Sequence, residues 1–312
     1  MHNFLLAPGR ANKAIFFLLI YFLFSQLILG LIAYIFDWDM SVTIILGQVI
    51  GLGLPFLAYL LITKQKFKDV IPSKGLTLKN VLIVTLISFT IIPMVNLISF
   101  FSSFVFYPLI FDILEDTSAP IWLTFISIGI LPSLFDQFWF RGVMYTKYRM
   151  GGVSILKTAL ITGLFFGLIH FNFHQAIYAT VIGILYAFIV YYTRSIWYVV
   201  LAHLINNGLS VLLTYSNTYM EWYSGLSTIS HILIMGGASV LMTPILLLCL
   251  RELKKYRADT METHGEDVDS IPTEIIAEQE AKPIEKANVY TWGFWASLVI
   301  MILISIYFEL NF

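Results

Sequence analysis

Long apolar stretches separated by short polar segments set the pattern of this chain. Windows of roughly 20 predominantly apolar residues, the length that crosses the hydrocarbon core of a bilayer as a helix, recur along its whole length. The predicted spans are residues 15–36, 43–63, 81–103, 121–146, 155–172, 175–193, 196–214, 229–250 and 289–310. We therefore predict an all-α fold, a polytopic transmembrane helical bundle of about nine spans.

The composition supports a membrane protein. Of the 312 residues, 59% are hydrophobic and only 12% are charged, whereas roughly a quarter of the residues in an ordinary soluble domain are charged. The formal net charge of -1 is less informative than the positions of the lysines and arginines relative to the spans. We predict a lipid bilayer as the surroundings of the chain and no nucleic-acid partner.

Basic residues concentrate in alternate connections between the predicted spans. They are Arg10, Lys13, Lys64, Lys66, Lys68, Lys74, Lys79, Lys147, Arg149, Lys157, Arg194, Arg251, Lys254, Lys255 and Arg257. Loops of membrane proteins that are rich in lysine and arginine face the cytoplasm. This rule predicts a cytoplasmic N-terminus and an extracytoplasmic C-terminus.

Five regions follow from the spans and the polar segments. They are N-terminal helices over 1–120, a central core over 121–215, an eighth span within 216–250, an acidic linker over 251–288 and a last helix within 289–312. Low hydrophobicity and an acidic excess predict that the linker is flexible and cytoplasmic. The alternative is a docking tail for a basic partner.

Three polar clusters interrupt the apolar core. They are Asp136-Gln137-Phe138-Trp139-Phe140-Arg141-Gly142, Phe166 to His170, and His203 to Asn207. Each cluster lies roughly 14–20 Å along a helix from a basic residue at the predicted cytoplasmic side, so all three can meet in the inner half or middle of the bilayer. Ionisable groups are costly at that depth. We therefore predict one buried functional site, reached most easily from the cytoplasm.

The first cluster contains a possible internal pair. Asp136 and Arg141 are five residues apart, which is not ideal spacing on an α-helix, but arginine is long enough to reach back or across to another helix. The pair could neutralise itself and hold two helices together without any further function. Pro132 should kink this helix or open a backbone carbonyl.

The residue types fit the hydrolysis of a peptide bond. This reaction needs a base for water, a group that bears the oxyanion and an acid for the leaving amine. Asp136 is the only carboxylate in the clusters and is the candidate base, with His170 orienting or activating the water. His203 and Asn207, one helical turn apart, would bind the carbonyl oxygen. Alternatively, Asp136, His170 and His203 could hold Zn²⁺, so the residues leave open either no cofactor or zinc.

The order and spacing of these motifs resemble the CPBP group of intramembrane endopeptidases, which includes the CAAX prenyl endopeptidases and the bacterial Abi self-immunity proteins. The family pattern is a Glu-Glu pair with an arginine four residues after the second Glu, then Phe-x-x-x-His, then His-x-x-x-Asn or Asp. Arg141-Gly142, Phe166 to His170 and His203 to Asn207 match it within roughly residues 120–215.

This resemblance implies an endopeptidase of the CAAX or bacteriocin-processing type that acts on a membrane-associated peptide or protein. It implies catalytic roles for Asp136, His170, His203 and Asn207. Gln137, Arg141 and Phe166 would be supporting residues. It also favours a bacterial plasma membrane as the location.

The chain departs from the family pattern at the residue proposed as the catalytic base. The chain has Asp136-Gln137 where the family has Glu-Glu, which withdraws the carboxylate by over 1 Å, and a misplacement of that size can lower a rate on the order of 100-fold. Gln137 can hydrogen-bond Arg141 but cannot neutralise it, so Arg141 could pair with Asp136 instead.

Two kinds of function therefore stay open. The first is an active protease with Asp136 as its base, and the retained histidines favour it. The second is a catalytically degenerate membrane protein that binds another membrane protein as a scaffold, regulator or immunity factor. A transporter is a weaker third possibility, because no inverted repeat is evident.

Overall fold

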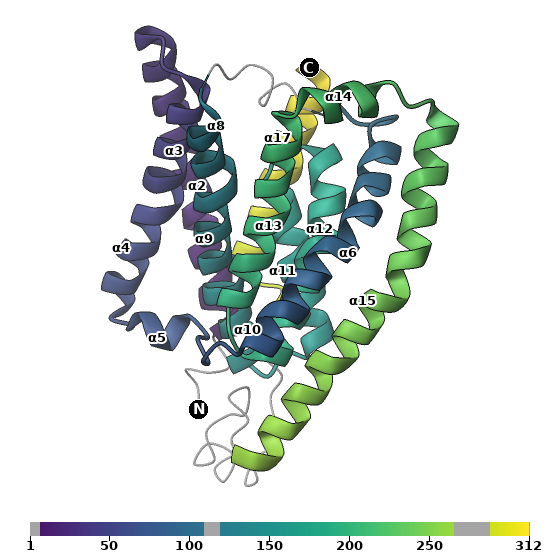
Figure 1. Ribbon diagram of the computed structural model, residues 1–312. Coiled ribbons are helices and arrows are strands. Elements are labelled where there is room, and N and C mark those ends of the chain that lie inside the picture. The colour runs from purple at the N-terminus through teal and green to yellow at the C-terminus, as the bar shows by residue number, and fades with distance from the viewer. Residues whose placement is uncertain (1–6, 109–118, 265–287, 312) are drawn as a thin grey trace, which may run out of the picture.

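A computed structural model describes residues 7–108, 119–264 and 288–311, and these form a bundle of helices (Figure 1). Within these residues the β-structure is limited to one isolated bridge between Ser73 and Ser195. The helices are α2 (Ala7–Phe36), α3 (Met40–Gln48), η1 (Val49–Gly53), α4 (Leu54–Thr63), α5 (Phe67–Val70), α6 (Leu78–Ser102), α8 (Ile121–Thr124), η2 (Phe125–Ile130), α9 (Leu131–Gln137), η3 (Phe138–Met144), α10 (Tyr145–Met150), α11 (Ile155–Leu168), α12 (Phe173–Thr193), α13 (Trp197–Thr214), α14 (Asn217–Ser224), α15 (Thr228–His264) and α17 (Trp292–Asn311).

Eight continuous helices in the described residues are long and apolar enough to cross a membrane, which confirms the predicted polytopic all-α bundle. Two of them combine several segments: α3, η1 and α4 form one, and α8 through α10 form another. Their outward-facing side chains are largely apolar, as lipid contact requires.

The fifth predicted span, 155–172, differs from the prediction. Its helix, α11, has 14 residues, which is about 21 Å long and shorter than the roughly 30 Å hydrocarbon core. The chain turns after Leu168, with Phe171 at a φ of 53°. Asn172 then caps α12, because its side-chain oxygen accepts the N–H of Gln175 at 2.9 Å.

The eighth predicted span extends beyond residue 250, since α15 continues to His264. Two contacts hold this extension: Glu252 pairs with Lys79 at 3.0 Å, and Arg257 donates to the Tyr191 carbonyl at 2.5 Å. The start of the predicted linker is therefore helical, and residues 265–287 of it lie outside the described part of the chain.

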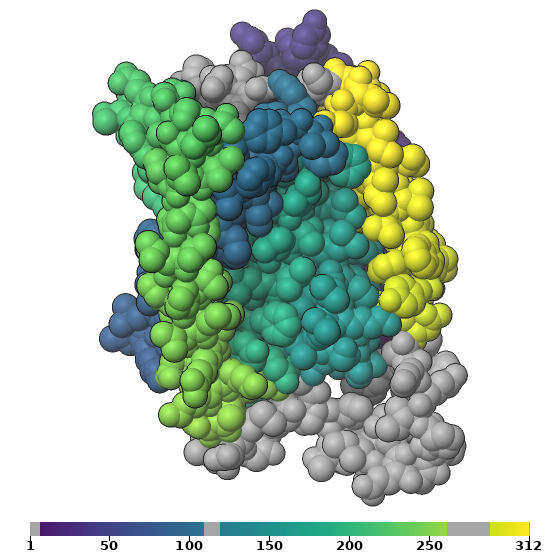
Figure 2. All heavy atoms as spheres, turned by 90° about the vertical axis from the view of Figure 1, so that its right-hand side faces the viewer, coloured from purple at the N-terminus to yellow at the C-terminus, as the bar shows by residue number. Residues whose placement is uncertain are grey.

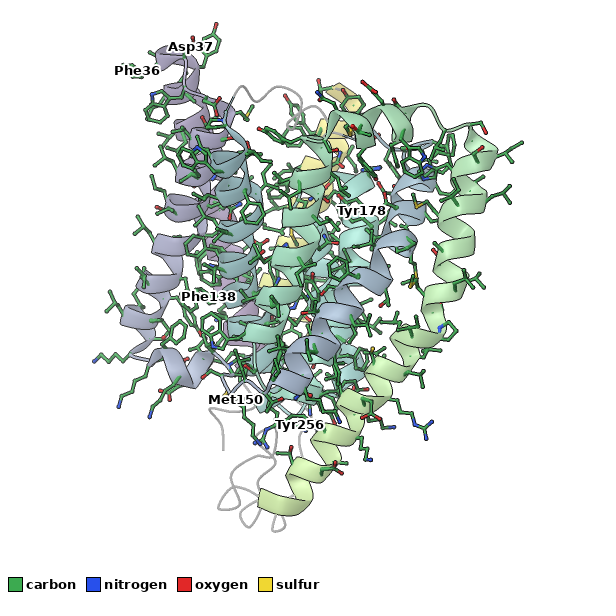
Figure 3. The ribbon with its side chains drawn as sticks, in the orientation of Figure 1. Phe36, Asp37, Phe138, Met150, Tyr178 and Tyr256 are labelled. Carbon is green, nitrogen blue, oxygen red and sulfur yellow. The ribbon has the colours of Figure 1, made fainter. Side chains whose placement is uncertain are left out.

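The two ends of the bundle differ in charge. The C-terminal ends of α4, α10, α12 and α15 lie toward the same, lower end of the bundle (Figure 1). These segments or the residues just after them carry Lys64, Arg149, Arg194 and Arg257. We call this the basic end. Asp37 lies at the opposite end from Met150 and Tyr256 (Figure 3). The sequence correctly predicted that the basic residues gather on one side.

The first and last helices pack together near the basic end. The Asn12 amide donates to the Val289 carbonyl at 2.7 Å and to Thr291 Oγ1 at 3.1 Å, and its oxygen accepts the Tyr148 hydroxyl at 2.6 Å. From there α17 runs along the teal helices α11 and α12 (Figure 2). The last helix thus docks on the bundle.

Candidate active site

The helix that carries Asp136 and Gln137 contains two π-helical stretches. η2 and η3 lie on either side of α9, which ends at Gln137. π-Helical turns are rare and occur frequently at functional sites. Because i→i+5 bonding widens the turn, Arg141 lies closer to the face of Asp136 than five residues of α-helix would bring it.

Pro132 leaves one backbone carbonyl of this helix without its helical N–H donor, and Asn207 donates a hydrogen bond to that carbonyl. Proline has no N–H to donate, and the carbonyl of Ile128, four residues earlier, accepts Asn207 Nδ2 at 3.0 Å. Asn206 Nδ2 lies 3.2 Å from the oxygen of Asn207. Asn207 thus ties α13 to the helix of Asp136 and keeps a second amide hydrogen.

Gln137 binds His203 and not Arg141, which differs from the expectation from the sequence. Its Nε2 lies 2.9 Å from His203 Nδ1, and both side chains are buried. An amide N–H that donates to Nδ1 leaves the hydrogen of a neutral imidazole on Nε2. Gln137 Oε1 is buried without a hydrogen-bond partner in the described residues.

Arg141 is fully buried and contacts a neighbouring helix. Its Nη2 donates to the Gly183 carbonyl at 2.6 Å, and its Cζ lies 4.5 Å from the Phe166 ring centroid. A Cβ at Gly183 would lie 3.1 Å from Nη2, so glycine leaves the space that the guanidinium needs. No ion pair joins Arg141 to Asp136 in the described chain.

One aromatic ring brings the three clusters together. Phe166 lies 5.5 Å from His170 and 5.5 Å from His203 between ring centroids, in edge-to-face geometry, and it also supports Arg141. Cation–π and edge-to-face contacts are favourable arrangements for an aromatic ring. Arg141, His170 and His203 therefore all lie against the Phe166 ring, whereas no hydrogen bond or ion pair joins Asp136 to either histidine among the described residues.

His170 lies in the turn after α11, where the helix ends. Its Nδ1 is 2.9 Å from the Phe166 carbonyl and 3.2 Å from the Gly167 carbonyl. Carbonyls only accept, so Nδ1 carries the hydrogen and Nε2 keeps a free lone pair. His170 is thus an acceptor at Nε2, whereas His203 is a donor at its own Nε2.

Asp136 is 6% exposed and makes no hydrogen bond or ion pair with any described residue. Its carboxylate is therefore available to a ligand or a water. In the described residues, no group of three or more His, Cys, Asp or Glu side chains is placed to hold a metal ion. The structure therefore does not group Asp136, His170 and His203 as the three-ligand zinc site that the sequence left open.

Sequence reasoning missed two supporting positions. Tyr186 lies 5.9 Å from His203 between ring centroids and 5.7 Å from Arg141 Cζ. Gly183 provides the carbonyl for Arg141, and it packs against Gly163. The signal for close approach was present in the sequence, because Gly163 and Gly167 form the small-x-x-x-small pattern of tightly packed membrane helices.

Comparison with known proteins gives one family match. Residues 118–209 match the family described as type II CAAX prenyl endopeptidase Rce1-like. No curated protein and no solved structure gave a significant match. The matched segment begins just before α8 and ends in α13, so it contains every candidate site residue named above.

Proposed function

We propose that this integral membrane protein is an endopeptidase that hydrolyses a peptide bond of a membrane-associated substrate, because residues 118–209 match the family described as type II CAAX prenyl endopeptidase Rce1-like. The main support is the convergence of Arg141, His170 and His203 on the Phe166 ring. A structural helix pair would need none of these polar groups at membrane depth.

The proposed chemistry uses the hydrogen positions derived above. Asp136 takes a proton from a water whose other hydrogen is oriented by His170 Nε2. The water oxygen attacks the carbonyl carbon, and His203 Nε2–H donates to the oxygen that becomes negative. Asp136 then returns its proton to the amine nitrogen as the C–N bond breaks. The second amide hydrogen of Asn207 can join His203 at the oxyanion.

Arg141 supplies charge without a paired carboxylate in the described chain. Its guanidinium lies on the Phe166 ring between the two histidine-bearing segments. A fixed positive charge in a water-poor site stabilises negative charge that develops in the transition state. We assign Arg141 a positioning and electrostatic role, and Asp136 the proton transfer.

Matched histidine substitutions test this proposal. His203→Phe keeps the ring contacts but removes the Nε2 donor, and we expect kcat/KM to fall by about 10²–10³-fold, the typical effect of losing one oxyanion donor. The measurement is cleavage of a quenched membrane-peptide library by the purified protein in lipid. His231→Phe is the control, since His231 is also buried and stacks on Phe100. A wild type that cuts no peptide in the library contradicts the proposal.

A catalytically degenerate scaffold, regulator or immunity factor is the second candidate. The observation that favours it is the unpaired Oε1 of Gln137 beside His203, where the resemblance expects a carboxylate. In that case the protein would bind another membrane protein without cutting it.

Substitutions at Gln137 separate the two candidates. For a working protease, Gln137→Leu should lower kcat/KM by tenfold or more, because nothing then fixes the His203 tautomer. Gln137→Glu should lower it as well, because an ionised carboxylate only accepts and would draw the hydrogen of His203 to Nδ1, away from the oxyanion. For a silenced protease, the wild type is inert and Asp136→Glu/Gln137→Glu gains cleavage. The same peptide library and lipid serve for all variants.

We also propose the orientation and the location. The basic end would face the cytoplasm, which places the start of α2 inside and the end of α17 outside. A bacterial plasma membrane fits the resemblance best.

A further inference from the structure

Two adjoining hollows form a groove between α2 and α4. The first has a volume of about 460 Å³ and the second about 540 Å³, and Ala14, Tyr59 and Thr63 line both. We call them together the α2–α4 groove. The first hollow is apolar and is lined by Phe17 and Leu54 among others. The second lies at the basic end.

The second hollow contains two cations. Arg10 and Lys147 both line it. Lys147 is only 7% exposed, and it makes no hydrogen bond or ion pair with any described residue. Asp69, on the neighbouring α5, accepts the Lys66 backbone N–H at 3.2 Å instead. Arg10 and Lys147 place two positive charges at one hollow, and these repel each other, so an anion between them would be favoured.

We propose that the α2–α4 groove binds one anionic phospholipid, with its phosphate between Arg10 and Lys147 and one acyl chain along the apolar hollow. Basic pockets between membrane helices are suited to anionic lipid head groups. Along α2 the lining runs from Ala7 to Tyr21, and the part from Arg10, at the proposed phosphate, to Tyr21 is about 16 Å long. That length is close to half of the roughly 30 Å hydrocarbon core, and therefore to the depth of one leaflet.

The bound lipid would contact the helix that carries the candidate site. Trp139 lines the apolar hollow and lies two residues after Gln137. Its Nε1 donates to the Leu52 carbonyl at 3.1 Å, which fixes this helix against η1. An acyl chain in the groove would thus hold Trp139 in place. Any effect of the lipid on cleavage rests on the proposed function, whereas binding of the lipid to the α2–α4 groove does not depend on it.

Native mass spectrometry of the full-length protein with phosphatidylglycerol tests the binding. Lys147→Gln should weaken retention of this lipid about fivefold, and Arg10→Gln/Lys147→Gln about 25-fold, at about fivefold for each cation near the head group. Lys68→Gln is the matched control, because Lys68 is exposed on α5 and lines neither hollow. Ala58→Trp leaves both cations in place but fills the apolar hollow, and it should also abolish retention.

Three results would overturn the proposal. Equal weakening by Lys68→Gln and Lys147→Gln would show diffuse attraction to the basic end. Equal retention of phosphatidylcholine or of a neutral isoprenoid would show that the cations do not select the occupant. Competition by inorganic phosphate alone, with Ala58→Trp unaffected, would show an ion site without an acyl chain. None of these readouts requires cleavage, so a failure here is distinct from a failure of the protease proposal.

Discussion

Asp136→Asn is expected to lower kcat/KM for peptide cleavage by about 10⁴-fold, the upper end of the contribution of a general base. The carboxylate is the acceptor for the proton of water, and an amide cannot take it. Folding should persist, because Asp136 has no partner among the described residues to lose. A buried amide is also less costly than a buried carboxylate, so the melting temperature should stay the same or rise.

The control for this substitution makes the same chemical change at an exposed site. Asp37 has a φ of 51°, a conformation that asparagine tolerates, so Asp37→Asn should change neither cleavage nor melting. If Asp136→Asn cleaves at the wild-type rate, another group activates the water and the proposed base is wrong. Asp136→Glu, which extends the carboxylate by one methylene, then reports whether the reach of the base limits the rate.

Gly167→Ala should produce the largest loss of stability among single substitutions near the site. A Cβ at this position would lie 2.5 Å from the Ala176 carbonyl oxygen and 3.0 Å from the Thr180 nitrogen, and backbone cannot move aside without separating α11 from α12. Overpacking of this kind costs typically 1–3 kcal/mol. Cleavage should fall as well, because His170 follows three residues later and one of its hydrogen bonds is to the Gly167 carbonyl.

Thermal unfolding in detergent measures this effect, with Gly30→Ala as the control. Gly30 lies in α2, is exposed, and nothing would meet a Cβ within 4 Å. In that setting alanine favours the helix over glycine by about 1 kcal/mol, so Gly30→Ala should be neutral or stabilising. Equal melting temperatures for Gly167→Ala and the wild type would mean that the two helices do not pack as closely as described.

The sequence was sufficient for the all-α architecture and for the proximity of Arg141, His170 and His203. Apolar windows predict helices because unpaired backbone N–H and C=O groups are not tolerated in the membrane, and a helix pairs these groups within a single segment. Polar groups at matched depth were expected to lie close together, and Arg141, His170 and His203 all lie against the Phe166 ring. The family resemblance carried by these residues was confirmed by the match over residues 118–209.

The partners of individual side chains could not be predicted in this way. Arg141 uses the carbonyl of Gly183, 42 residues away, and a backbone acceptor leaves no mark in the sequence. Gln137 turns to His203 because the π-helical turns change which positions share a face, and a hydropathy pattern does not distinguish π from α turns. The sequence did not predict that α11 ends at Leu168. Phe171 and Phe173 keep the 155–172 window apolar through the turn that follows this helix.

The junction at Asn12 links the first helix to the last, and this has a consequence for biosynthesis. Asn12 is fully buried, and its amide donates to Val289, 277 residues later. At about 5–20 residues per second, the ribosome needs on the order of 15–60 s between these two positions. Throughout that time α2 resides in the membrane with a polar side chain that lacks its final acceptor. We therefore expect insertion chaperones and membrane quality control to bind the incomplete bundle until α17 has been inserted.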